Sequence, residues 1–156
     1  MEGSFMDLSL SLLLVAGITI GDMNSKESLT HFDNYTKAYR AAQILKQPML
    51  VILNPVVDSG QKPISLGDIR RTKQRRELLE KYIIVVLDTK TEHGKTCHKL
   101  FGSAPLPRVV VIDKRQKYQI FQTSEALYGQ LWTKILETYR KGERSNVDPT
   151  ATYCPT

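Results

Sequence analysis

The sequence holds few of the residues that covalent chemistry uses. It has two cysteines, Cys97 and Cys154, which lie far apart and belong to no Cys-x-x-Cys pair and no zinc-like cluster. It contains neither the Gly-x-Ser-x-Gly turn of serine hydrolases nor a phosphate-binding P-loop, and no loop brings two carboxylates together. Local motifs for dithiol exchange, ester hydrolysis and nucleotide binding are therefore absent, and no motif indicates a cofactor.

No apolar run is long enough for a membrane-spanning helix. The uncharged run at residues 8–20 falls short of the roughly 20 residues that a span needs. Its length suits the apolar region of a secretory signal peptide, although Glu2 and Asp7 precede it and no basic residue accompanies them. The period-2 alternation of residues 8–12 favours a first β-strand instead. Residues 1–22 are therefore interpreted as a signal peptide or an N-terminal strand, with a disordered or docked end as a third interpretation. Export and a cytoplasmic location stay equally open.

The overall composition is that of one globular domain with a basic surface. The chain has 156 residues, of which 41% are hydrophobic and 24% charged, which is enough to bury an ordinary core. Its formal net charge is +6. Such a charge favours encounters with acidic proteins or nucleic acid but says nothing about the fold.

Apolar runs and helical periodicity alternate along the chain. The runs at residues 49–53, 83–87 and 109–112 are typical of strands buried on both faces, and residues 118–122 predict a fourth strand. Four helices are predicted, from a cap at Thr30 or Asp33 to Leu45, from a cap at Ser65 to Tyr82, over residues 91–101, and from a cap at Ser124 to a stop at Gly142. Residues 143–156 are interpreted as a flexible tail. Strands that alternate with helices pair in parallel and the last two form a hairpin, so the predicted class is α/β with a mixed sheet and helices on both faces.

Two stretches resemble the segments that flank the active site in the thioredoxin-like fold family. Residues 35–51, which include the sequence Lys-Gln-Pro-Met-Leu-Val, resemble the approach to the catalytic strand in bacterial members. Residues 101–113 are similar to the segment around the cis-proline of that family, and Pro107 would be this proline. The resemblance covers roughly residues 33–141. It implies a thioredoxin-like three-layer α/β/α fold with a mixed central sheet, in a domain over residues 30–142.

The stretch after the first central strand departs from the redox members of this family. Where they carry Cys-x-x-Cys, the matching positions here are near Asp58 and Gln61, so dithiol exchange, which needs an attacking thiolate, is excluded there. The resemblance thus indicates a divergent bacterial-type member without that motif and without catalytic residues. It still implies a groove that binds a protein or an extended peptide. The groove residues would be Asp58, Ser59, Gly60, Gln61, Leu106 and Pro107.

Cys97 is the one cysteine inside the expected domain, and it leaves a thiol-dependent oxidoreductase open. Lys95 could lower its pKa, and pairing with Cys154 would require the tail to fold back. His93 lies one helical turn before Cys97 and His98 directly follows it, but a zinc site needs four ligands, or three and a water. A partly buried free thiol is the simplest interpretation, and no metal site is predicted.

The predicted helix over residues 65–82 is rich in arginine and lysine. Arg70, Arg71, Gln74 and Arg75 would form one outward face, which could grip nucleic-acid phosphates or an acidic partner. No aromatic residues interleave this face and no nucleic-acid motif accompanies it, so a solvated surface is the simpler interpretation. The sequence therefore favours a redox-inactive binding module, with a thiol-dependent oxidoreductase and a basic-surface binder as alternatives.

Overall fold

The centre of the molecule is a mixed sheet of six strands. The computed structural model describes residues 31–144 and 152–153. Its strands are β1 (His31–Phe32), β2 (Met49–Asn54), β3 (Ile83–Asp88), β4 (Arg108–Ile112), β5 (Tyr118–Thr123) and β6 (Thr152–Tyr153). They follow the order β1-β3-β2-β4-β5-β6 across the sheet. The first three in this order run parallel to one another, whereas β4, β5 and β6 each pair antiparallel with the strand before them.

β2 is buried on both faces, which explains its uninterrupted apolar sequence. Its residues 49–53 have no exposed surface. Side chains point alternately to the two faces of a strand. Leu50 and Ile52 accordingly pack into one hydrophobic cluster, while Val51 and Leu53 pack into a second one on the other face. A strand of this kind needs a helical layer on each side of the sheet.

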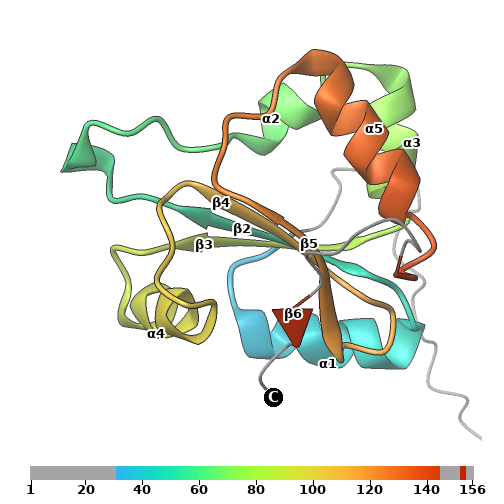
Figure 1. The fold of residues 1–156 in the computed structure, drawn as a ribbon, viewed down its shortest axis with the longest axis horizontal. Helices are drawn as coiled ribbons and strands as arrows, with labels where there is room; N and C mark the ends of the chain where they lie inside the picture. The colour runs from blue at the N-terminus through green and yellow to red at the C-terminus, as the bar shows by residue number, and fades with distance from the viewer. Residues whose placement is uncertain (1–30, 145–151, 154–156) are drawn as a thin grey trace, which may run out of the picture.

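Helices supply both of these layers, as Figure 1 shows. On one face lie α1 (Tyr35–Leu45) and α4 (Glu92–Leu100), and on the other lie α2 (Leu66–Ile69), α3 (Lys73–Leu79) and α5 (Gly129–Tyr139). Trp132 of α5 belongs to the cluster of Leu50, whereas Ala38 of α1 and Cys97 of α4 belong to the cluster of Val51. The three-layer α/β/α architecture with a mixed central sheet is therefore confirmed.

The first helix starts later than predicted, and a short strand precedes it. His31 and Phe32 pair in parallel with β3 and form the edge of the sheet. Asn34, rather than Thr30 or Asp33, caps α1, because its Oδ1 accepts a hydrogen bond of 3.0 Å from the backbone N–H of Lys37. A strand of two residues is too short to show periodicity, so the sequence pattern could not reveal it.

The single helix predicted over residues 65–82 is wrong. Ser65 does cap its start, since its Oγ accepts from the Gly67 N–H, but α2 ends after one turn at Ile69. Thr72 leaves the helical conformation and caps α3, where its Oγ1 accepts from the Arg75 N–H at 3.2 Å. A threonine side chain that satisfies the backbone outside a helix competes with helix continuation.

The last helix also begins later than predicted. Ser124 does not cap it, because its Oγ donates to the Pro105 carbonyl oxygen at 2.6 Å. α5 instead begins at Gly129 after Tyr128, which makes no side-chain capping bond. Its end agrees with the prediction: Gly142 has a positive φ of 62° and its N–H donates to the Tyr139 carbonyl oxygen.

The ends of the chain are described only in part. Residues 1–22, interpreted from the sequence as a signal peptide or strand, lie outside the described residues. Within the expected tail, Thr152 and Tyr153 pair with β5 as the short strand β6, and the tail remains a prediction. Within residues 31–144 and 152–153, no helix combines the length and apolar character needed to cross a membrane.

Candidate functional site

Pro107 lies where the loop after α4 enters β4, and its peptide bond with Leu106 is cis. This is the bond for which the resemblance implied a cis conformation. Leu106 and Pro107 contact opposite faces of the sheet. Leu106 packs against the cluster of α1 and α4, whereas Pro107 lines a cleft on the opposite side of the sheet.

This cleft, called the Pro107 cleft below, is the candidate site. It has a volume of about 400 Å³ and lies between the loop before α2, the helices α2 and α3, and the start of α5. Its lining consists of residues 62–65, Asp68, Ile69, Arg71, Arg75, Pro107, 126–129 and Trp132. A cleft of this size can hold several side chains of a ligand.

Asn54, at the end of β2, decides which residues of the following loop reach the cleft. Its Nδ2 donates to the Ile64 carbonyl oxygen at 3.0 Å, and its Oδ1 accepts from the Ile64 N–H at 2.8 Å. This pair of bonds closes the loop at its base, so residues 62–65 lie at the cleft. The residues between project away from the body, as the green loop at the far left of Figure 1 shows.

The structure does not bring residues 58–61 and Pro107 into one groove. Val57, Asp58 and Ser59 form a short 3₁₀ turn at the tip of the loop, and Gly60 follows with a φ of 72°. Asp58, Ser59, Gly60 and Gln61 are all exposed and do not line the Pro107 cleft. Residues 62–65 occupy the position beside Pro107 that the sequence predicts for residues 58–61. The sequence pattern cannot reveal this shift, because it depends on the hydrogen bonds between Asn54 and Ile64.

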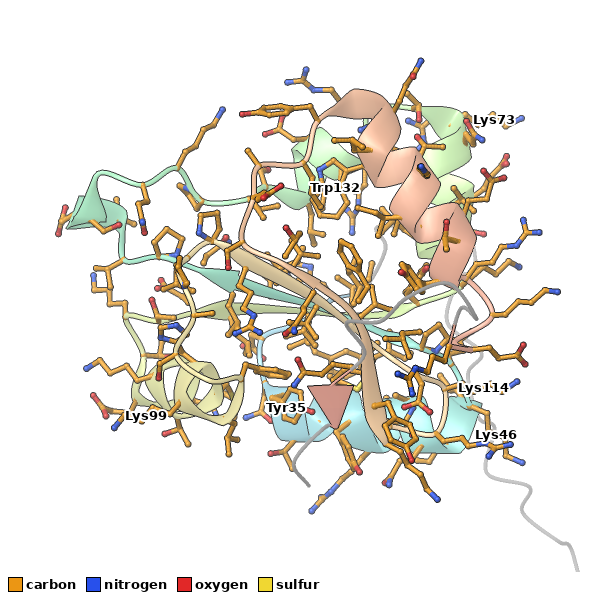
Figure 2. All side chains as sticks on the ribbon, viewed as in Figure 1. Tyr35, Lys46, Lys73, Lys99, Lys114 and Trp132 are labelled. Carbon is orange, nitrogen blue, oxygen red and sulfur yellow. The ribbon has the colours of Figure 1, made fainter. Side chains whose placement is uncertain are left out.

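Apolar side chains form much of the cleft wall. Trp132 is only 4% exposed, and Figure 2 shows it between α5 and α2. Ile69 is fully buried, and Leu127 is partly buried against the same cluster. Tyr128, by contrast, is 72% exposed at the rim. Apolar walls with an exposed aromatic ring beside them suit an apolar side chain of a ligand.

The basic residues near the cleft do not form the outward face predicted from the sequence. Arg75 is only 6% exposed and points inward: its Nε donates to Thr72 Oγ1 at 3.1 Å and its Nη1 to the Asp68 carbonyl oxygen at 3.3 Å. Arg71 is exposed and pairs with the Asp68 carboxylate at 2.8 Å. Arg70 is half-buried, and Gln74 is exposed on α3. The break between α2 and α3 changes the rotation of Arg75 relative to Arg71, so a single helical face was a wrong prediction.

Cys97 lies in the other layer of the molecule. It is 2% exposed within the cluster of α1 and α4, and this burial raises the pKa of its thiol. Its Sγ lies 3.7 Å from His93 Nε2, which also accepts a hydrogen bond of 2.9 Å from the Tyr35 N–H. A raised pKa reduces the thiolate fraction that redox chemistry needs. Cys154, the partner considered for Cys97, lies outside the described residues.

The histidines are also placed apart. His98 Nε2 lies 2.7 Å from the Ala104 carbonyl oxygen, and His31 is exposed on the edge strand β1. In the part of the chain that the structure describes, no three His, Cys, Asp or Glu side chains are grouped to hold a metal ion.

Comparisons with known proteins identify the fold. No family model and no curated protein matches the chain. Among solved structures, a DsbH oxidoreductase is similar with 13% identity and a TM-score of 0.53, over 77% of this chain and 93% of that one. The solution structure of a thioredoxin from Thermus thermophilus is similar with 14% identity and a TM-score of 0.48, over 69% and 85% of the two chains. At this level of identity the likeness to the DsbH oxidoreductase shows the fold alone, which is thioredoxin-like as predicted.

Proposed function

We propose that this thioredoxin-like chain is a binding module that receives an extended polypeptide in the Pro107 cleft and carries out no dithiol exchange there. The observation that carries the proposal is the composition of the cleft. Beside the cis-proline it has apolar walls, and its lining by the described residues includes no cysteine. A surface that can bury ligand side chains but offers no sulfur nucleophile is suited to binding rather than to thiol exchange.

The exposed residues around the cleft support a polypeptide as the ligand. Tyr128 and Leu131, which are 72% and 49% exposed, follow one another around the first turn of α5. Exposed aromatic and aliphatic side chains beside a hollow are typical of the places where protein ligands anchor. We expect one apolar ligand side chain to enter the cleft against Leu127 and Pro107, with the neighbouring ligand residues over Tyr128.

Binding is tested by selecting random peptides displayed on phage against the whole chain. A selected peptide is then labelled with a fluorophore, and its affinity is measured by anisotropy. Leu127→Glu places a charge in the cleft wall and should weaken binding at least about tenfold, the equivalent of about 1.4 kcal/mol. Leu100→Glu is the matched control, because Leu100 is an exposed leucine at the end of α4, in the other helical layer, and does not line the cleft. Equal affinities for the two variants would refute a site in the cleft.

The alternative enzyme is a thiol-dependent oxidoreductase that uses Cys97. It is tested by reduction of insulin with dithiothreitol, measured for the wild-type chain and for Cys97→Ser. We expect no turnover above the blank in either sample, since the Cys97 thiol is buried in the layer away from the cleft. Turnover that disappears in Cys97→Ser would show redox work and would contradict the proposed binding role.

A further inference from the structure

Arg75 is the feature of the Pro107 cleft that apolar binding leaves unexplained. It lines the cleft while 6% of its surface is exposed, and the two bonds of its guanidinium go to Thr72 Oγ1 and the Asp68 carbonyl oxygen. Both acceptors are neutral. Among the described residues, no carboxylate forms an ion pair with Arg75, and its Nη2 has no hydrogen-bond acceptor. Burial of a charge without a counter-charge is costly, so an anion from outside would be stabilised beside it.

The remaining charges of the cleft lead to the same conclusion. Among the described residues, its lining has three basic side chains, Lys62, Arg71 and Arg75, against one carboxylate, that of Asp68. That carboxylate accepts a hydrogen bond of 2.8 Å from Arg71 Nη2 and so offsets the charge of Arg71. Lys62 is exposed at the mouth of the cleft. Lys62 and Arg75 therefore remain as positive charges in a cleft whose other walls are largely apolar.

The two cations are suited to different tasks. A guanidinium with a free Nη2 can donate a charge-assisted hydrogen bond to a carboxylate, and such bonds are about twice as strong as neutral ones. The exposed lysine acts as a point charge that attracts an acidic segment and is screened by salt. Bonds to Thr72 and Asp68 hold Arg75 in one orientation, so the ligand loses little affinity to ordering it.

We propose that the Pro107 cleft selects acidic peptide segments, with a ligand carboxylate at Arg75 and Lys62 and an adjacent apolar side chain against Leu127 and Pro107. This inference rests on the proposed function, because it names the chemistry of the polypeptide that the cleft receives. An acidic segment also agrees with the formal net charge of +6 on the chain.

The first test is the composition of the peptides that the whole chain selects from a random phage library. We expect Asp and Glu to be enriched next to an aliphatic or aromatic residue, relative to the unselected library. Peptides that bind in the cleft without this enrichment would overturn the acidic preference and leave the proposed function standing. A failure to select any peptide sensitive to Leu127→Glu would overturn both.

The second test places the carboxylate at Arg75. Affinities of a selected peptide, and of the same peptide with its glutamate replaced by glutamine, are measured by anisotropy. Arg75→Met should weaken binding of the acidic peptide about tenfold or more and leave the glutamine peptide almost unchanged, because only the carboxylate forms a charge-assisted hydrogen bond with Arg75. Arg76→Met is the matched control: it removes the same charge from the next position of α3, outside the cleft. Equal losses in the two variants would refute a specific contact.

Two further measurements keep the outcome clear. If thermal melting shows that Arg75→Met is unfolded, Lys62→Met carries the test, since Lys62 is exposed and its loss should weaken binding and flatten the salt dependence. A labelled single-stranded DNA of twelve nucleotides is run as the competing anion. Displacement of the acidic peptide by that DNA at lower concentration than by free peptide would overturn the proposal in favour of phosphate recognition.

Discussion

Replacement of Gly94 by alanine should reverse the usual sign of a glycine-to-alanine change in a helix. Gly94 lies in the first turn of α4, and alanine at such a position normally stabilises a helix by up to about 1 kcal/mol. Here an added Cβ would lie 2.0 Å from the carbonyl oxygen of Asp88 and 2.6 Å from its carbonyl carbon. Both are backbone atoms at the end of β3, so no side-chain rotation can relieve the contact.

The Asp88 carbonyl is also held in place. It accepts hydrogen bonds from the Thr91 N–H at 3.1 Å and from Thr91 Oγ1 at 2.9 Å, and that same Oγ1 accepts from the Gly94 N–H. α4 must therefore move away from the sheet, which strains a cluster that includes Cys97. Overpacking costs about 1–3 kcal/mol, and a contact with fixed backbone atoms belongs in the upper part of that range, about 2–3 kcal/mol. After subtraction of about 1 kcal/mol for the helix propensity gain, we expect a net destabilisation of about 1–2 kcal/mol.

Thermal and urea unfolding, followed by circular dichroism, measure this effect. For a chain of this size about 1 kcal/mol corresponds to roughly 3 °C, so the melting temperature of Gly94→Ala should fall by about 3–6 °C. Gly67→Ala is the control, because an added Cβ there would meet one side-chain atom, Ser65 Oγ, at 3.3 Å and no backbone atom of another element. A Gly94→Ala chain as stable as the wild type would refute the close approach of α4 to the end of β3. Peptide binding should persist in the folded variant, since the Pro107 cleft lies in the other layer.

Three further changes test separate parts of the structure. Tyr82→Phe should cost about 1–3 kcal/mol, because the Tyr82 hydroxyl donates to the buried Leu136 carbonyl oxygen at 2.7 Å. Burial raises the pKa of Tyr82 far above its ordinary value near 10, so the stability it contributes is present below that value and is lost as the pH rises above it. Between pH 9 and pH 11 the free energy of unfolding should fall more in the wild type than in Tyr82→Phe. Equal decreases would contradict the raised pKa of Tyr82 as the cause. Asn54→Ala removes both hydrogen bonds to Ile64, so hydrogen exchange at the Ile64 N–H should accelerate and peptide affinity should fall. Unchanged exchange would contradict the role of Asn54 in closing the loop. Burial raises the pKa of the Cys97 thiol, so iodoacetamide at pH 8 should label it slowly in the folded chain and rapidly in urea. The measurement uses a Cys154→Ser chain, in which Cys97 is the remaining thiol. Fast labelling of the folded chain would show that the thiol is accessible.

The sequence predicts the layers of this fold well because their signal is local. The continuous apolar runs of β2, β3 and β4 arise from burial on both faces, and their short length and β-branched residues favour strands over buried helices. The break between α2 and α3 has no such signal. Residues 70–77 between Ile69 and Leu78 are all polar and include no glycine or proline, so only the capping bond of Thr72 shows where the chain turns.

The candidate site was harder to predict because contacts between distant residues build it. Pro107 was found through the resemblance, whereas the residues facing it were placed too early in the loop by about four positions. The side chain of Arg75 points inward because of the break between α2 and α3, which the sequence pattern does not show. An arginine on a solvated face contributes little to stability, whereas Arg75, buried in the cleft and without an ion pair among the described residues, is the basis of the proposed acidic ligand.

The helical layers on the two sides of the sheet are fixed by different kinds of contact. On the side of α1 and α4, two helices pack on the sheet through small buried residues, and Gly94 allows α4 to pack directly on β3. On the other side, α5 buries a large apolar face, whereas α2 and α3 are short. Single polar side chains fix the cleft there: Asn54 closes the loop at its base and Thr72 positions Arg75. We expect substitutions at such positions to change the shape and charge of the cleft while the apolar layers stay intact. Under the proposed function, the ligand preference of this scaffold would then change at little cost to its core.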